Sequence, residues 1–169
     1  FILALSFTGE YTKYHINRAG QQNGTNIKKK ALVLSEMVVA INRINEVYEN
    51  DLAISFQIIG NNDKIIYLDG ATDPYSNNDG SALINENQTN IDNVIGTANY
   101  DIGHVFSTGG GGLAALGSTC STSKAKGVTG TSNPVGDYYY FDFVAHELGH
   151  QLGANHSFNG DAGNCGGNR

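Results

Sequence analysis

Near the end of the sequence, three histidines and a glutamate occur at a spacing that can hold and use a metal ion. The residues from His146 to His156 read H-E-x-x-H-x-x-G-x-x-H. Residues four apart on a helix lie on the same face, so His146 and His150 can direct ring nitrogens at one ion. Glu147 is rotated by about 100° around the helix axis. Its carboxylate is therefore expected beside the ion rather than bound to it.

A turn after this helix is needed to bring the third histidine back to the ion. Gly153 can adopt a positive φ at little cost, so the helix can end there and the chain can reverse towards His156. Three protein ligands leave a fourth position open, which distinguishes a catalytic zinc site from a closed structural one. The expected chemistry is hydrolysis by a zinc-activated water, with Glu147 as the general base that removes its proton.

Other interpretations of the same residues stay open. H-E-x-x-H alone occurs by chance and in several kinds of zinc peptidase, but five fixed positions over this length make a chance match rare. The histidines could be ordinary core or solvated side chains. The main alternative is an extracellular binding module that binds zinc without catalysing a reaction, and a zinc amidase or esterase is a second.

The zinc motif resembles that of the metzincin zinc metallopeptidases, and upstream segments resemble their reprolysin/adamalysin branch, in particular the secreted bacterial reprolysin-like type. These segments are 102–108, the glycine run 109–112 with Leu113 and Ala114, 117–120 and 143–150. The resemblance covers nearly the whole chain. It implies a secreted or cell-surface metalloendopeptidase, a hydrolase with one catalytic Zn²⁺ ion, whose signal and pro-segment are not in this chain.

One departure from the metzincin pattern concerns the Met-turn, which follows the third histidine in that clan. The single methionine here is Met37, far upstream. The resemblance therefore implies a fragment that stops before the Met-turn. Residues 1–155 are expected to form the N-terminal subdomain with the zinc helix, and residues 156–169 to begin a C-terminal subdomain. Whether these residues alone are active is left open.

The resemblance also predicts where an extended protein or peptide substrate binds. In reprolysin-like enzymes the strand equivalent to 101–106 is an edge strand beside the cleft, and such an edge offers unpaired backbone groups to an added strand. His104 is expected to be a surface or packing histidine rather than a fourth ligand. The glycine run is either a rim that admits a ligand closely or a plain loop. The predicted substrate-edge residues are Gly103, His104, Val105, Gly112, Leu113 and Ala114.

Hydrophobic periodicity predicts the elements that position these residues. The strand–helix alternation favours an α/β fold, a metzincin (zincin-like) catalytic domain with a twisted mixed sheet flanked by long helices. A loop is expected at 15–26. The expected strands are 1–8, 52–59, 64–68 and 101–106, and the expected helices are 27–49, 88–95 and the zinc helix 137–152.

Composition limits the partners. The net charge of −6 makes nucleic acid and anionic membranes poor partners. No apolar run is long enough for a membrane span. A length of 169 residues with 40% hydrophobic residues suits one domain. The expected partner is a protein or peptide substrate, and the oligomeric state stays open.

Two cysteines are too few to define a disulfide framework. Cys120 and Cys165 could pair with each other, pair with cysteines beyond this sequence, or be free thiols. The family resemblance implies disulfides. The segment 73–80 contains carboxylates and amides suited to Ca²⁺, but its spacing does not fit an EF-hand loop. The first strand also lacks the acidic residue that many reprolysin-like enzymes use, so a structural calcium ion stays open but has no support.

Overall fold

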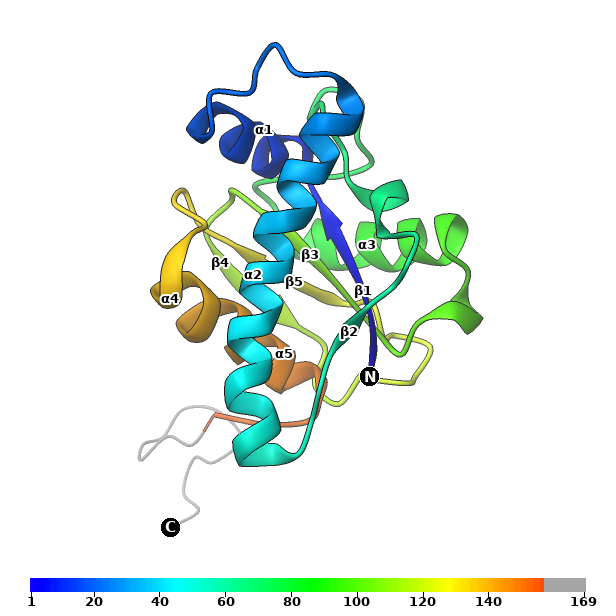
Figure 1. Cartoon of the computed structure of the whole chain (residues 1–169). Helices are drawn as coiled ribbons and strands as arrows, with labels where there is room; N and C mark the ends of the chain where they lie inside the picture. The colour runs from blue at the N-terminus through cyan, green and yellow to red at the C-terminus, as the bar shows by residue number, and fades with distance from the viewer. Residues whose placement is uncertain (157–169) are drawn as a thin grey trace.

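The computed structural model describes residues 1–156, which form an α/β domain around one mixed sheet (Figure 1). Within these residues the strand order is β2-β1-β3-β5-β4. Strand β4 runs antiparallel to β5, and the other neighbours are parallel. The α/β prediction is confirmed. The strands are β1 (Ile2–Phe7), β2 (Gln57–Ile58), β3 (Ile102–Ser107), β4 (Gly111–Ala114) and β5 (Gly127–Gly130).

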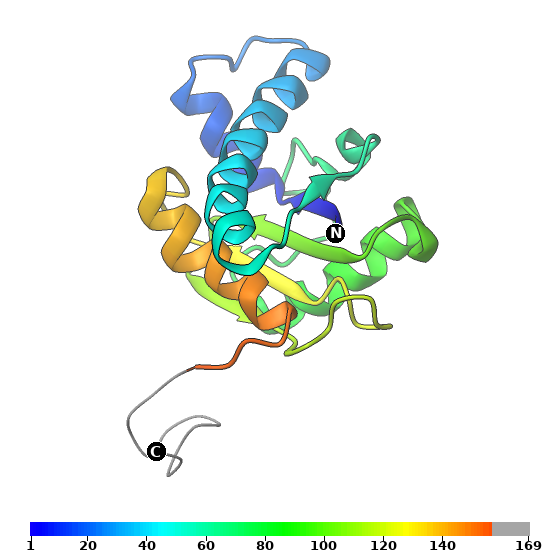
Figure 2. The ribbon, with the colours of Figure 1, turned by 60° about the horizontal axis from the view of Figure 1, so that its bottom comes forward.

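Helices cover both faces of this sheet (Figure 2). Helices α1 and α2 share one face with the helix that carries the zinc motif, and α3 covers the other. No helix within residues 1–156 has both the length and the apolar character needed to cross a membrane. The helices are α1 (Gly9–Arg18), α2 (Asn26–Leu52), α3 (Gly80–Val94), α4 (Gly136–Tyr139) and α5 (His146–Gln151), with 3₁₀ turns η1 (Asn62–Ile65) and η2 (Thr97–Asn99) and a π-helical segment η3 (Tyr140–Ala145).

The core follows from the alternation of side chains along β1. Leu3, Leu5 and Phe7 are buried under α1, α2 and the motif helix. Ala4 points to the opposite face and packs beside α3. Because successive side chains of a strand point to opposite faces, this apolar run serves two cores at once.

Several predicted segments differ in the structure. Of the strand expected at 52–59 only Gln57–Ile58 is a strand, and the helix expected at 88–95 begins earlier, at Gly80. The expected loop at 15–26 is partly helical, because α1 begins directly after β1, where the Thr8 side chain accepts a hydrogen bond from the Tyr11 amide. Such an N-cap satisfies an amide that the first helical turn leaves unpaired. The expected strand at 64–68 is not formed: the 3₁₀ turn η1 ends at Ile65, and within this range Ile66 alone forms a bridge, to Phe7.

The prediction that 101–106 is the sheet edge is wrong. The corresponding strand, β3, lies between β1 and β5, so Gly103, His104 and Val105 are buried in the middle of the sheet. A nearly continuous buried run is typical of an interior parallel strand. The outer strand on this side is β4, which carries Gly112, Leu113 and Ala114.

His104 is fully buried on β3 and is held by two side chains. Its Nδ1 lies 2.7 Å from Oε1 of Gln151, and its Nε2 lies 2.8 Å from the Thr129 hydroxyl. An amide oxygen only accepts, so Nδ1 carries the proton and Nε2 accepts from Thr129. Burial lowers the pKa of His104 from 6.5 to about 4, against the opposing effect of the hydrogen bond to Gln151.

We expect His104 to make the fold less stable as the pH falls from 6.5 to about 4. In this window the unfolded chain gains a proton that the folded chain does not bind. The free energy of unfolding therefore drops by about 1.4 kcal/mol per pH unit, on the order of 3 kcal/mol in all. Above this window both states are neutral and the effect vanishes. NMR titration of the ring measures it directly, and a folded-state midpoint near 6.5 would contradict it.

Candidate metal centre

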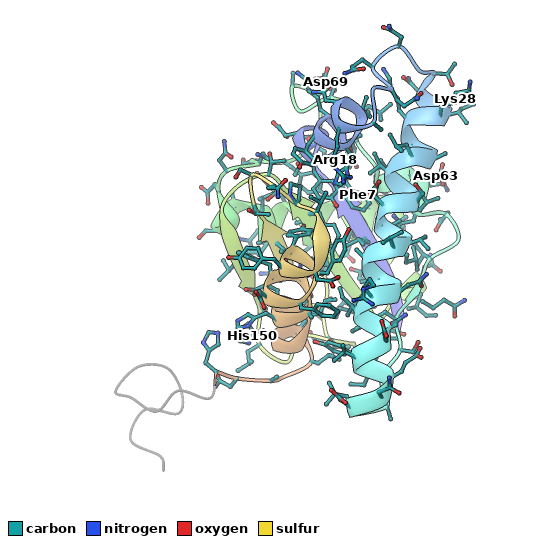
Figure 3. All side chains as sticks on the ribbon, turned by 60° about the vertical axis from the view of Figure 1, so that its left-hand side comes forward. Phe7, Arg18, Lys28, Asp63, Asp69 and His150 are labelled. Carbon is teal, nitrogen blue, oxygen red and sulfur yellow. The ribbon has the colours of Figure 1, made fainter. Side chains whose placement is uncertain are left out.

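The motif lies on the last turns of one long helix that runs through α4, η3 and α5. Val144 and Leu148 are fully buried against the core, which fixes the face that the helix turns to the sheet. From α2, the Tyr48 hydroxyl donates a 2.6 Å hydrogen bond to the Ala145 carbonyl. Figure 3 places His150 at the outer surface, near the end of the helix.

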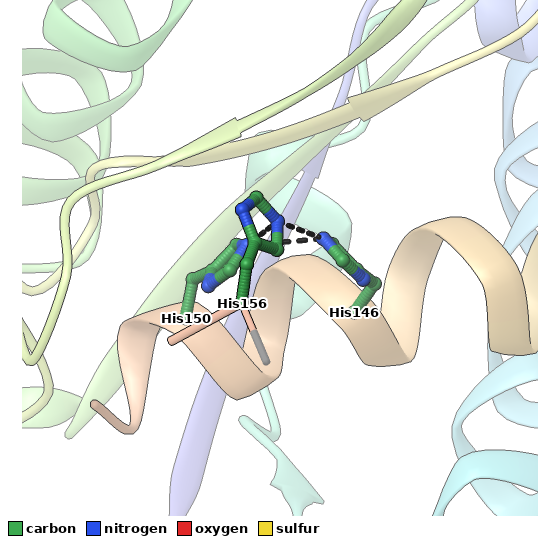
Figure 4. A group of neighbouring side chains, drawn as sticks. All are labelled: His146, His150 and His156. Atoms are coloured by element: carbon green, nitrogen blue, oxygen red, sulfur yellow. Dashed lines mark hydrogen bonds between the residues drawn. The ribbon is translucent and has the colours of Figure 1, made fainter. Parts of the chain in front are cut away.

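The structure brings the three motif histidines together (Figure 4). His146 and His150 project from the same face of α5, one turn apart. Gly153 has a φ of +103°, and the chain returns there so that His156 faces the other two rings. The Nε2 atoms lie 2.9 Å apart for His146 and His156, and 3.0 Å apart for each pair that includes His150.

Hydrogen bonding fixes the tautomer of His150. Its Nδ1 lies 2.7 Å from the Ala154 carbonyl, so Nδ1–H donates and the Nε2 lone pair faces the other rings. Burial, followed by the charges of His150 and His156, lowers the pKa of His146. These effects favour the neutral imidazole, which is the form that binds metals.

The cluster fits a zinc ion. Nitrogen ligands at 2.0–2.1 Å from a tetrahedral zinc lie about 3.3 Å apart, close to the observed separations. A metal ion can be held where at least three histidine, cysteine or acidic side chains come together. Within residues 1–156, these three histidines are the group that meets this condition. Among residues 1–156 no fourth side chain joins the three imidazoles, and three such ligands leave a coordination position open, as in catalytic zinc sites.

Glu147 lies beside the histidines and against the edge strand. Its side chain is largely buried, and this burial raises the pKa of the carboxyl, while His150 opposes the rise. A Cβ atom at position 112 would overlap the Glu147 carboxylate. The backbone of β4 can therefore pass against this carboxylate only because residue 112 is glycine. A hollow of about 270 Å³ is lined by both residues, by His150 and His156, and by Leu113.

The segment 117–120 caps the carbonyl groups at the end of α5. The Gly117 amide donates to the His150 carbonyl, and the Thr119 amide and hydroxyl both donate to the Gln151 carbonyl, at 2.9–3.0 Å. Helix ends leave such carbonyls without partners. Cys120 is exposed at this turn. Cys165 lies outside the described residues, so its pairing stays a prediction.

The sequence thus predicted the residues that meet at the centre but gave no role to Gln151, whose buried amide contacts His104. His146, Glu147, His150 and His156 come together, and Gly112, Leu113 and Ala114 lie on the adjoining edge. Gln151 was missed. The signal for it was a polar residue three positions after Leu148, on the core-facing side of the helix.

We expect zinc to stabilise the chain and His150→Ala to remove most of this effect. A ligand that binds only the folded state at 100 times its Kd adds about 2.7 kcal/mol to the free energy of unfolding. Urea unfolding with zinc or with a chelator measures the difference. His15→Ala, which changes a histidine outside the cluster, should keep the zinc response. An undiminished response in His150→Ala would exclude His150 as a ligand.

Comparisons with known proteins agree with this geometry. The family profile described as Metallo-peptidase family M12B Reprolysin-like matches residues 34–157. No curated protein matches the chain. A chain in a solved structure described as a chaperone–substrate complex is similar in fold, with a TM-score of 0.55 and 15% identity; the match covers 99% of this chain but 28% of that one. Because the family profile spans most of the sequence and the whole H-E-x-x-H-x-x-G-x-x-H motif, the chain belongs to the reprolysin-like metallopeptidases of family M12B.

Proposed function

We propose that this chain carries the zinc centre of an endopeptidase that cleaves extended protein substrates, with His146, His150 and His156 as the ligands. The observation that carries the proposal is the meeting of three imidazole Nε2 atoms beside a buried carboxylate. Reprolysin-like peptidases are often extracellular, and we propose a secreted or cell-surface location. We also propose that residues 1–155 form the N-terminal subdomain and that 156–169 begin the next one.

Glu147 is the proposed general base. Zinc, when bound, supplies a Lewis acid that lowers the pKa of water and polarises the scissile carbonyl. Glu147 takes the proton of the attacking water and passes it to the leaving amine. Its position one residue after His146 places the carboxylate beside the three ring nitrogens. The packing of β4 against its carboxylate limits its movement.

Strand β4 is the proposed substrate edge. Its one partner within the described residues is β5, so the outer side of Gly112, Leu113 and Ala114 can pair with an extended peptide. Backbone pairing gives affinity for many sequences, and side-chain pockets give selectivity. A peptide on this edge would lie beside the hollow that β4 shares with Glu147 and His150, which supports endopeptidase activity over the hydrolysis of small esters or amides.

We expect Glu147→Gln to abolish proteolysis while zinc stays bound. Loss of a general base lowers turnover by about 10²- to 10⁴-fold. Cleavage of an unfolded protein by the natural protein and by the variant measures the loss, and elemental analysis measures the zinc. A chelator should stop the wild-type reaction. Full turnover by a zinc-loaded variant would disprove the role, and zinc without any wild-type cleavage would favour an inactive binding module.

Gly112→Ala should lower turnover through displacement of the Glu147 carboxylate. The new methyl group overlaps the carboxylate, which must then move away from its place beside the histidines. We expect a fall of at least about tenfold in kcat, since small misplacements of catalytic groups cost up to about 10²-fold.

The matched control for this change is Gly110→Ala. A Cβ atom at position 110 has no neighbour within 4 Å, and the residue lies just before β4. Its kcat should equal that of the wild type. Equal kcat values for the two variants would show that the contact at position 112 does not set the position of Glu147.

A further inference from the structure

Gln151 follows His150 directly, and its side chain enters the sheet instead of solvent. The residue is fully buried. Its Nε2 donates to the Gly103 carbonyl at 2.9 Å and to the Lys124 carbonyl at 3.2 Å. Its Oε1 accepts the 2.7 Å hydrogen bond from His104 Nδ1. The Gln151 amide thus forms hydrogen bonds through both its nitrogen and its oxygen. These bonds also fix which way round the amide lies.

The Gln151 amide lies where the regular hydrogen-bonded pairing between β3 and β5 ends. Regular pairing covers Val105 to Ser107 on β3 and does not continue towards Gly103. Beyond it, Gly103 N donates to the Lys124 carbonyl, and Gln151 bonds to the carbonyls of both residues. Where regular pairing stops, a side chain from the motif helix therefore links the two segments beside the backbone hydrogen bond from Gly103 to Lys124.

The space for this amide depends on another glycine. A Cβ atom at Gly127 would overlap the Gln151 amide and the His104 ring. On the far side of His104, the Thr129 hydroxyl continues the chain of hydrogen bonds along β5. A buried chain of this kind gives the helix one fixed setting, because each polar group in it has a directional partner.

We propose that Gln151 is the positioning residue of the metal centre: through His104, Gly103 and Lys124 it sets where α5 places His146, Glu147 and His150. Buried apolar contacts such as those of Leu148 permit small shifts of the helix, whereas three hydrogen bonds at one residue do not. The backbone carbonyl of Gln151 is held as well, by Thr119. The proposal rests on the proposed zinc-binding function of the three histidines.

The test is the zinc Kd of the chain, measured by competition with a chromophoric chelator at a temperature where circular dichroism shows each variant folded. Gln151→Met keeps the length of the side chain but removes its hydrogen bonds. We expect its Kd to rise about tenfold or more, as for other residues that support metal ligands. Gly127→Ala keeps the glutamine but fills its space, and should raise the Kd as well. If Gln151→Met does not fold, Gln151→Asn and Gly127→Ala provide the test.

Asn62→Leu is the matched control. Asn62 is also a buried amide that bonds to a strand, through the Leu5 amide and carbonyl at 3.0 and 2.7 Å, but it lies away from the motif helix. Its loss should lower the free energy of unfolding and leave the zinc Kd unchanged. A wild-type Kd in Gln151→Met or Gly127→Ala, or an equal rise in Asn62→Leu, would overturn the positioning role alone. Absence of zinc binding by the wild type would overturn the proposed function as well.

Discussion

Three imidazole nitrogens that meet within 3.0 Å of one another constrain every element around them. Hydrogen bonds among the three rings cannot satisfy all three nitrogens. His150 has no proton on its Nε2 to donate, because its proton lies on Nδ1 and is donated to the Ala154 carbonyl. Lone pairs that face one point are stabilised by a cation. The helix must therefore turn one face outwards, end at Gly153 and return His156 to that face, while its opposite face stays packed on the sheet.

The motif helix packs closely against the sheet at two places. At each place a glycine in the strand permits the close contact. Gly112 leaves room for the Glu147 carboxylate on β4, and Gly127 leaves room for the Gln151 amide on β5. Neither glycine is needed there for a turn. Each removes a side chain that would separate α5 from its strand. The chemistry of this centre thus depends on residues of β4 and β5 that carry no chemical group of their own.

The part of this arrangement that the sequence predicts is the local part. The spacing of His146 and His150 and the role of Gly153 depend on one helical turn and one φ angle, which neighbouring residues determine. Strand order depends on which segments pair, which neighbouring residues do not determine. The edge position expected for β3 came from the family resemblance, and the strand lies inside the sheet. Gln151 was missed although its place on the core-facing side of the helix indicates burial, because the sequence does not show that a distant strand leaves a gap for its amide.

A buried amide suits this position better than another apolar residue would. Apolar packing is strong but has little directionality, so a helix held by Val144 and Leu148 alone could settle in several closely spaced settings. A metal centre tolerates little such freedom, because its ligands must point at one place. Hydrogen bonds from Gln151 to two carbonyls and one ring are directional and become unfavourable when the helix moves. The apolar contacts of the helix therefore supply most of its binding to the sheet, and this one polar residue selects among the settings that those contacts allow.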